Sequence, residues 1–252
     1  MKYQQRFSSV NSSVLDPDVR INKAKKIVTI IEHFFNSTGG SLANSICVDI
    51  GGSAGFTAVE LSKRAKEVYV VDIDEQALEY GKKHNCAKNI HYQVGDAMRL
   101  PFRNDSISVV ICNQVYEHVP SSEILMREIY RILKENGICY FGAGNRFKVM
   151  EPHYHLPFLS WLPKSLANFY MKSVKKGEKY YENHLSYFNL KKIIAPFTVI
   201  DYTYRVLSEP ERFFNTDVVK SNSLLTKIPR RVYACLKPLS PGFIFILKKQ
   251  GS

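Results

Sequence analysis

The sequence predicts an α/β fold: a doubly wound, mostly parallel seven-stranded sheet with helices on both faces and with helical or irregular insertions. Two observations carry this prediction. Short apolar runs alternate with helical stretches between about residues 46 and 142, which is the pattern of βαβ crossovers in a parallel sheet. In addition, the apolar run that ends at Ile50 enters a glycine-containing turn, and a second run ends 21 residues after Gly51, at Asp72. This pairing is typical of a cradle for an adenosine derivative.

The first predicted element is a helix over residues 16–38. Asp16 and Pro17 are typical helix-starting residues, apolar side chains recur at helical spacing, and Gly39 and Gly40 end the pattern. We expect this helix to cover one edge of the main sheet. The next 100 residues, 46–145, form the predicted ligand-binding core. Its strands are expected at about 46–50, 68–72, 90–93, 107–113 and 138–142, and its helices at 55–64, 75–84 and 122–133.

Two irregular segments then interrupt the alternation. Residues 146–186 are rich in proline and aromatic residues and predict an insertion over the carboxyl edge of the sheet, which we interpret as a substrate lid. Its expected helix, 164–174, places Leu166, Phe169, Tyr170 and Val174 on one side. This segment interleaves lysines with aromatic residues, and in the alternative interpretation the apolar members of this set pack onto the sheet while the lysines face water. The regular pattern resumes with a helix at 188–195 and a strand near 197–204, and it ends, after a second basic insertion at 205–240, with a strand at 243–247.

The chain has no linker-like composition shift and no internal repeat, so residues 1–252 are predicted to form a single domain. Five cysteines without C-x-x-C spacing predict buried thiols in a reducing compartment. The N-terminus lacks the apolar region of a secretion signal, and no run approaches the ~18 apolar residues of a membrane span. We therefore expect a cytoplasmic protein.

The net charge of +12 is concentrated in the second part of the chain. Residues 1–145 carry a net charge of +1 and residues 146–252 carry +11. This asymmetry suggests an anionic partner such as a phosphate, a lipid headgroup or a nucleic acid. A solvated face of the protein is the alternative.

The turn at residues 51–55 does not fit the dinucleotide fingerprint G-x-G-x-x-G, because Ser53 and Phe56 stand at its second and third glycine positions. It instead resembles the first motif of class I S-adenosylmethionine-dependent methyltransferases, D-x-G-x-G-x-G, with Asp49, Gly51 and Gly55 matching. Ser53 replaces the usual middle glycine, so we expect its side chain to point away from the cofactor. The resemblance implies that Asp49, Gly51, Gly52, Ser53 and Gly55 bind S-adenosylmethionine in a Rossmann-like fold.

Four further motifs in the expected order extend the resemblance over residues 46–145 and indicate the type 11 group. Asp72, followed by Ile73, resembles the acidic residue that binds the ribose hydroxyls. Asp96 and Ala97, in G-D-A-x-x-L-P-F, are similar to the residues that contact adenine. Residues 113–120, beginning with Asn113 and Gln114, resemble the segment under the methionine moiety, and residues 127–137 resemble the helix and turn before the fifth strand. In the alternative interpretation, Asp72 is an ordinary carboxylate at the end of a strand, and Asp96 is a residue that forms a turn.

Methyl transfer from this cofactor needs alignment of the acceptor and, for a hydroxyl acceptor, a general base. The candidate bases are Glu117, His118, His153, His155 and His184, of which we assign His118, Glu117 and His155 as catalytic; His118 as a core histidine is the alternative. We assign substrate contacts to Tyr116, His153, His155, Tyr181 and His184. His153 and His155 form an H-x-H pair, but no carboxylate or cysteine obviously completes a metal site, so we expect no metal.

Lysines interleave with aromatic residues between Trp161 and Tyr181 and again between Arg230 and Lys237, which suits a lipid headgroup, a sugar phosphate or a single-stranded nucleic acid. The stretch 151–163 also resembles one in methyltransferases that accompany glycan and glycolipid assembly genes. Our main hypothesis is a methyltransferase of a small-molecule, lipid-linked or glycan acceptor, with O-, N- or C-methylation left open, that works in the cytoplasm or peripherally at the inner membrane surface. The alternatives are a methyltransferase of RNA or another nucleic acid, which is a weaker candidate partner, and a non-catalytic binding module. No obligate protein partner is evident.

Overall fold

A seven-stranded sheet forms the centre of the molecule. The computed structural model describes residues 17–250, so Asp16 lies outside the described part. The strands follow the order β3-β2-β1-β4-β5-β9-β8, and only β9 runs antiparallel to its neighbours. Their bounds are β1 Ile46–Ile50, β2 Glu67–Asp72, β3 Ile90–Val94, β4 Ile107–Asn113, β5 Leu133–Gly144, β8 Phe197–Asp201 and β9 Gly242–Lys249. The predicted fold class is therefore confirmed.

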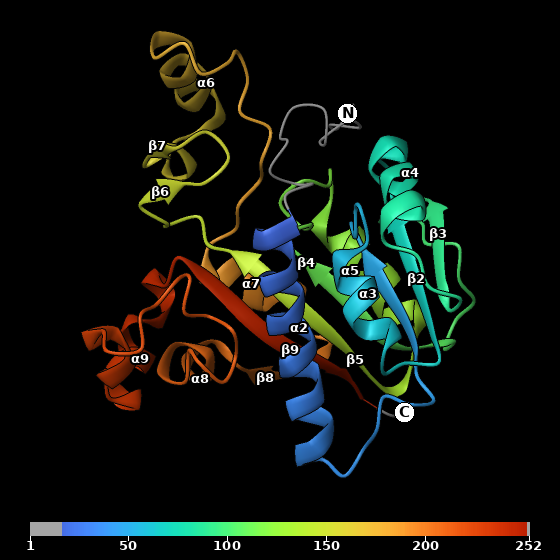
Figure 1. Ribbon diagram of the computed structural model, residues 1–252. Helices are drawn as coiled ribbons and strands as arrows, with labels where there is room; N and C mark the ends of the chain where they lie inside the picture. Colours follow the sequence, from blue (N-terminus) through green and yellow to red (C-terminus); the bar gives the residue numbers. More distant parts are fainter. Residues whose placement is uncertain (1–16, 251–252) are drawn as a thin grey trace.

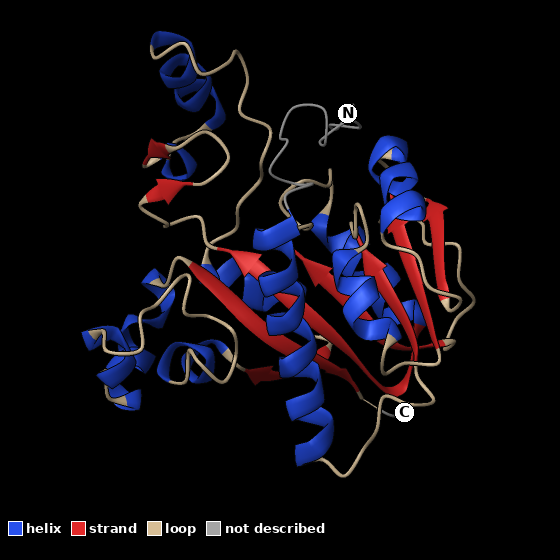
Figure 2. Ribbon diagram, viewed as in Figure 1, coloured by secondary structure: helices blue, strands red, loops and turns tan. Residues whose placement is uncertain are grey.

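Helices cover both faces of this sheet (Figure 2). One face carries α2 (Pro17–Ser37), α3 (Phe56–Ser62), α4 (Glu75–His84) and α8 (Thr203–Ser208), and the other carries α5 (Ser122–Ile132) and α7 (Tyr187–Ile193). Alternation along β4 explains why both faces are apolar: Val109 and Ile111 pack in the cluster that includes α2, and Val110 and Cys112 pack in the cluster that includes α5.

The helix α2 crosses the middle of the sheet and not its edge, so the sequence prediction was wrong on this point (Figure 1). Ile27, Ile30 and Ile31 are buried in one cluster with residues of four central strands, Cys47 of β1, Val109 of β4, Tyr140 of β5 and Ile246 of β9. The apolar stripe of α2 could be predicted from its spacing, but the strands that it covers depend on tertiary contacts.

Two strand boundaries also differ from the prediction. β5 begins at Leu133 and not near residue 138, because Leu133 pairs with Ile107 before a register shift. Residues 134–136 are exposed and polar, and Asn136 has a positive φ of 59°, so no strand pattern is visible there. β8 ends at Asp201, whose carboxylate accepts a hydrogen bond from the Thr203 N–H (2.8 Å) just as α8 begins.

The segment 146–186 forms β6 (Met150–Glu151), β7 (Leu156–Pro157), a 3-10 turn η2 (Leu159–Trp161) and α6 (Lys164–Ser173). It projects from the end of β5 (Figure 1) and has its own small core of Leu156, Leu159, Ala167, Met171 and Tyr180. Ala167 and Met171 are the buried residues of α6, and Leu166 and Phe169 are exposed. Trp161, Phe169 and Tyr181 are exposed, and Tyr180 packs in this small core, so the alternative in which the aromatic residues of this segment pack onto the sheet is wrong.

The second insertion contains η3 (Leu224–Lys227), α9 (Arg230–Leu236) and η4 (Lys237–Leu239). Cys47, Cys112 and Cys139 are buried in strands, as predicted, but Cys86 and Cys235 are exposed because they lie after α4 and on α9, away from the sheet. Within residues 17–250, no helix has both the length and the apolar character needed to cross a membrane.

Candidate functional site

A pocket of about 400 Å³ opens at the carboxyl ends of β1, β2 and β4. It lies where the chain leaves β1 and β4 in opposite directions, the usual place for a ligand in a doubly wound sheet. The predicted residues that line it are Asp49, Gly51, Gly52, Ser53, Asp72, Ile73, Ala97, Asn113, Gln114, His118 and His153. It is also lined by Arg20, Lys23, Ile27, Phe56, Thr57, Val71, Asp74, Gly95, Val115, Val119 and Pro152.

The turn between β1 and α3 forms the floor of the pocket. Gly51 has φ 66°, and a Cβ there would lie 2.7 Å from a Val115 methyl group, so only glycine fits without a shift. Ser53 also adopts a left-handed conformation, with φ 51°, which explains why glycine is usual at this position. The Ser53 N–H donates to Asp72 Oδ2 (2.8 Å), and the buried Ser53 Oγ has no hydrogen-bond partner among the described residues.

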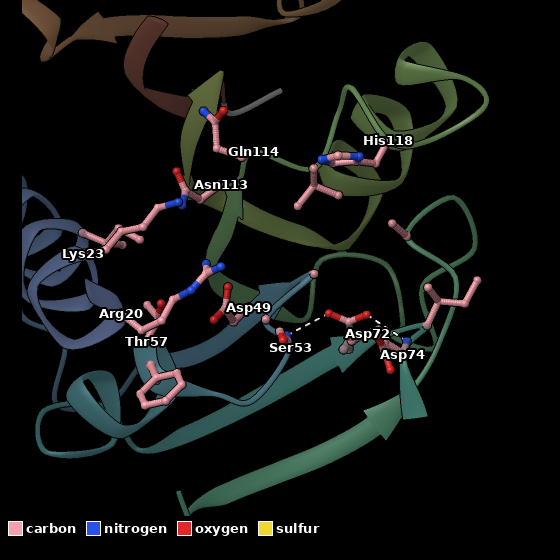
Figure 3. Close-up of a pocket in the computed structure, with 18 of the residues that line it drawn as sticks. Arg20, Lys23, Asp49, Ser53, Thr57, Asp72, Asp74, Asn113, Gln114 and His118 are labelled. Atoms are coloured by element: carbon pink, nitrogen blue, oxygen red, sulfur yellow. Dashed lines mark hydrogen bonds between the residues drawn. The ribbon is translucent and has the colours of Figure 1, made fainter. Parts of the chain in front are cut away.

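A buried carboxylate, Asp49, and a half-buried one, Asp72, face the pocket. Asp72 Oδ1 accepts the Asp74 N–H (2.9 Å), so both of its oxygens are fixed by backbone donors (Figure 3). Burial raises the pKa of Asp72, although these hydrogen bonds oppose the shift. For Asp49, burial and then the charge of Asp72 raise the pKa to about 7. The site therefore holds anionic groups that a cationic ligand would stabilise.

The helix α2 adds two cationic side chains that were not predicted from the sequence as site residues. Arg20 and Lys23 extend into the pocket from the side opposite Asp72 (Figure 3). Burial, followed by the charge of Arg20, lowers the pKa of Lys23 to about 8. The spacing of residues 20, 23 and 27, which places all three on one face of a helix, was the available signal.

The loops after β3 and β4 complete the walls. Gly95 and Ala97 line the pocket, and the Asp96 carboxylate accepts the Met98 N–H (2.8 Å) within its own turn. Gln114 has a positive φ of 58°, and its N–H donates to the Gly142 carbonyl (2.8 Å). This bond ties the loop after β4 to β5 and sets the course of the segment that leads to His118.

His118 and His153 meet at the edge of the pocket, with ring centroids 5.1 Å apart and planes at 90°. Burial, helped by the nearby His153 and His184, lowers the pKa of His118 to about 3. His118 is therefore a neutral imidazole near pH 7.

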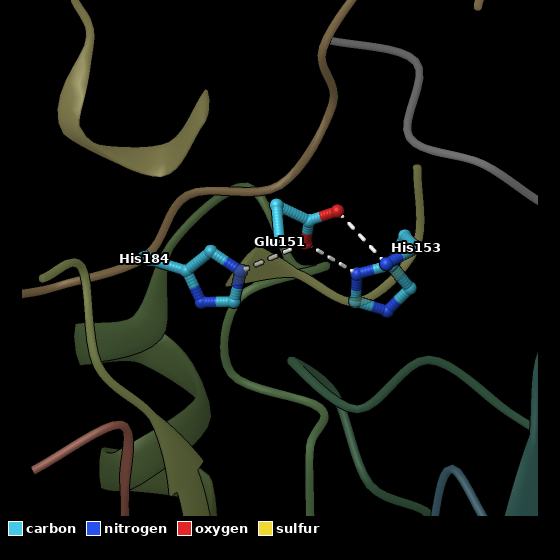
Figure 4. A group of neighbouring side chains, drawn as sticks. All are labelled: Glu151, His153 and His184. Carbon is cyan, nitrogen blue, oxygen red and sulfur yellow. Dashed lines mark hydrogen bonds and ion pairs between the residues drawn. The ribbon is translucent and has the colours of Figure 1, made fainter. Parts of the chain in front are cut away.

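Behind His153, the fully buried Glu151 binds several partners (Figure 4). Its Oε1 lies 2.7 Å from His153 Nδ1 and 3.6 Å from His184 Nε2. The sequence showed no carboxylate that completes a metal site with the pair His153 and His155. In the structure Glu151 does join His153, but the third member is His184 and not His155, and the ligand atoms of Glu151, His153 and His184 lie within 4.8 Å of one another. However, the Lys148 ammonium lies 2.8 Å from His184 Nε2 and 3.6 Å from Glu151 Oε1. A cationic side chain thus already occupies this cluster.

The other predicted site residues lie outside the pocket lining. Tyr116 is buried and donates to the Gly144 carbonyl, and Glu117 is buried beside it with neither carboxylate oxygen hydrogen-bonded among the described residues. Burial raises the pKa of Glu117 to about 7. His184 is part of the Glu151 cluster, and Gly55, the last residue of the turn, precedes α3 outside the pocket lining. His155 and Tyr181 are exposed, so the structure does not bring them to the pocket.

Comparison with known proteins gives a family match over the same region. A model described as a methyltransferase domain matches residues 48–141. The chain is 27% identical over 144 residues to the ubiquinone biosynthesis O-methyltransferase of Idiomarina loihiensis, covering 56% of this chain and 59% of that protein. It is 34% identical over 130 residues to the demethylmenaquinone methyltransferase of Staphylococcus haemolyticus, covering 49% and 53%. The matches span between 36% and 59% of the length of these and two other curated relatives.

Solved structures share the fold over nearly the whole chain. The SAM-dependent methyltransferase of Methanosarcina mazei superposes with a TM-score of 0.57 at 16% identity, covering 88% of this chain and 98% of that one. The YcgJ protein of Bacillus subtilis gives a TM-score of 0.54 at 15% identity, covering 90% and 99%. At these identities the likeness supports a common architecture only.

Proposed function

Residues 48–141 belong to the type 11 family of class I S-adenosylmethionine-dependent methyltransferases, and from this premise we propose that the protein transfers a methyl group to a small, apolar or lipid-linked acceptor. The family match also confirms the predicted cofactor. The observation that carries the proposal is the pocket, whose polar groups correspond to the functional groups of S-adenosylmethionine.

The pocket residues fit this cofactor group by group. Asp72 lies at the end of β2, where its carboxylate can accept bonds from the ribose hydroxyls. Ser53 lines the pocket, and its Oγ has no hydrogen-bond partner among the described residues, so we propose that it makes a further polar contact with the cofactor, contrary to the expectation that it points away. Arg20 and Lys23 suit the ligand carboxylate, and the buried Asp49 suits its positive charges. When bound, S-adenosylmethionine supplies an electrophilic methyl group on a sulfonium. The chain itself has to orient the acceptor and keep water away.

The surface of the two insertions supports an acceptor that is held at an anionic membrane. On the first, Phe169 is 71% exposed next to the exposed Lys172, Lys175 and Lys176. On the second, Leu224 is 82% exposed between Lys220 and Lys227. Large exposed apolar side chains flanked by lysines fit a lipid interface better than they fit plain solvent. The relatives named for ubiquinone and menaquinone biosynthesis agree with an apolar acceptor.

The test is the fate of the methyl group in a cell lysate. Purified protein is mixed with a lysate and with methyl-labelled S-adenosylmethionine, and the lysate is then separated into lipid, glycan and RNA fractions. We expect label in the lipid fraction and much less with Asp72→Asn. Label in the RNA fraction would favour the nucleic-acid alternative, and absence of label from all three fractions, with cofactor bound, would favour a binding module.

A further inference from the structure

Glu151 fixes His153 through two contacts, and the next residue through a third, at the edge of the cofactor pocket. Glu151 Oε2 accepts the backbone N–H groups of His153 (2.8 Å) and Tyr154 (3.0 Å), and Oε1 lies 2.7 Å from His153 Nδ1 (Figure 4). Because an ionised carboxylate only accepts hydrogen bonds, Nδ1 carries a hydrogen, and Nε2 is then the basic atom of the ring. A buried carboxylate that orients an imidazole is the arrangement by which enzymes prepare a general base.

We propose that His153 is the general base that takes the proton of an acceptor hydroxyl, with Glu151 as its positioning residue. This inference rests on the proposed function and narrows its acceptor to a hydroxyl compound, because an amine acceptor needs no base once it is unprotonated. The proton passes from the acceptor oxygen to His153 Nε2. The oxygen keeps the electron pair and uses it for the bond to the methyl carbon, while the sulfur keeps the electrons of its broken bond to that carbon. The imidazolium then releases its proton to solvent.

The other candidate bases fit this role less well. His118 lines the pocket, but burial makes it a very weak base, with a pKa of about 3. His184 is buried away from the pocket lining, and burial lowers its pKa to about 4. His155 is exposed, and Glu117 is buried outside the pocket lining. Of these five residues, His153 alone combines a place in the pocket lining with a bound carboxylate.

The charges around His153 favour its protonated form. Titratable groups from three segments face His153. Its own segment contributes Glu151 and Lys148, and the segment after α6 contributes Glu182 and His184. The loop after β4 contributes His118 and Glu117. Burial lowers the pKa of His153, but the hydrogen bond and the charge of Glu151 outweigh this effect, so the net shift is upward. A stronger base accepts the proton of a hydroxyl group more readily.

The first experiment asks whether the site ionises a phenol. The probe is 4-nitrocatechol bound to the complex of the whole protein with S-adenosylhomocysteine, because the absorbance of this phenol reports its ionisation. At a pH where the free probe is mostly protonated, we expect the phenolate band with the wild-type protein and its loss with His153→Gln. His155→Gln serves as the discriminating variant: if it and not His153→Gln abolished the band, the proposal would be wrong.

The second experiment measures methyl transfer to catechol and to the more acidic 4-nitrocatechol. For catechol, His153→Gln should lower kcat by ~10²-fold or more with little change in KM. The loss should be smaller for 4-nitrocatechol, since a phenol that is already ionised needs less help. A merely structural role of His153 would lower both rates equally, which is the result that contradicts the proposal.

Glu151→Gln tests the positioning role. Because it removes the carboxylate that raises the pKa of His153, the rise of kcat with pH should move to lower pH. An unchanged profile in a folded variant would overturn the role of Glu151. Since Glu151 is buried, His153→Gln keeps the proposal testable if this variant does not fold.

Two controls distinguish this proposal from a metal centre in the Glu151 cluster and from a failure of the cofactor assignment. Stoichiometric bound zinc, with phenol ionisation lost on chelation and restored by Zn²⁺, would make the cluster a metal centre and overturn the proposal. Calorimetry with S-adenosylhomocysteine reports on the cofactor site alone. If this ligand binds but neither phenol is ionised or methylated, the hydroxyl-acceptor inference fails and the cofactor assignment stands; if the ligand does not bind, the proposed function fails.

Discussion

Asp49 illustrates how burial gives a single residue a functional property. It lies at the end of β1, almost without exposure, and it shares the pocket with Asp72. With a pKa of about 7 it is neutral below this pH and ionised above it. A ligand with a positive charge favours the ionised form and should therefore bind better as the pH rises.

This titration predicts a difference between two ligands. S-adenosylmethionine carries a sulfonium charge that S-adenosylhomocysteine lacks, and their other groups are the same. The preference for S-adenosylmethionine should increase roughly 3- to 10-fold between pH 6 and pH 8, because Asp49 ionises in this range. Titration of both ligands at the two pH values checks this. With Asp49→Asn the preference should no longer depend on pH, and a constant preference in the wild-type protein would contradict the role of Asp49.

The sequence indicated the pocket residues next to β1 and β2 better than those that α2 and the first insertion bring to the pocket. Asp49, Gly51 and Asp72 lie within a continuous motif or at a fixed spacing from it, and all three line the pocket. Arg20 and Glu151 could not be assigned in this way. They belong to segments whose place over the pocket is decided by tertiary packing. The spacing of residues 20, 23 and 27 puts Arg20 on one face of the helix but does not say what that face covers, and no local pattern marks Glu151 as facing inward.

Among the elements, α2 has two roles. Its apolar stripe covers the centre of the sheet, and its first turns carry Arg20 and Lys23 into the pocket. Packing of this helix should therefore determine both stability and the position of the cationic groups.

Truncation of the α2 stripe tests the first role. Ile31 is fully buried, so Ile31→Ala should lower the free energy of unfolding by ~2–5 kcal/mol through lost contacts and a cavity. Val19, on the same helix, is 57% exposed, and Val19→Ala should change this free energy by no more than ~0.5 kcal/mol. Chemical denaturation measures both values. Similar losses in the two variants would show that α2 does not pack as described.

The helix α6 is the element on which the membrane proposal can be tested. Leu166 and Phe169 are exposed apolar residues on a segment that has its own core, so their replacement should not disturb the sheet. The variant with Leu166→Ser and Phe169→Ser should bind vesicles of phosphatidylcholine and phosphatidylserine ~10-fold or more weakly than the wild-type protein. Sedimentation with these vesicles is the measurement.

Phe188 provides the matched control, since it is 63% exposed and lies on α7, outside both insertions. Phe188→Ser should leave vesicle binding unchanged. Equal binding by all the variants, or salt-sensitive binding to tRNA in place of vesicles, would contradict the membrane proposal.

At the scale of the whole molecule, the sequence predicted the sheet because each strand–helix unit carries its own pattern. β1, β4 and α4 match their expected bounds for this reason. The path of residues 146–186 depends on contacts that no local pattern records. One example is the bond from the Arg146 N–H to the Leu185 carbonyl (2.9 Å), which joins the two ends of the segment. The lid role of this segment stays a prediction.

In the folded molecule, a pocket of the cofactor-binding type lies at the carboxyl edge of the sheet. His153, from the first insertion, lines the edge of this pocket. The central claim is that this pocket binds S-adenosylmethionine through the turn after β1 and the carboxylate at the end of β2. All the proposals on the acceptor depend on this claim.

The most direct test is calorimetric titration of the purified protein with S-adenosylhomocysteine. We expect one ligand per chain, binding that is weakened ~10- to 100-fold by Asp72→Ala, and unchanged binding in Glu79→Gln, which alters an exposed carboxylate on α4. Absence of binding by the wild-type protein, or equal affinity in Asp72→Ala, would contradict the assignment of the cofactor site.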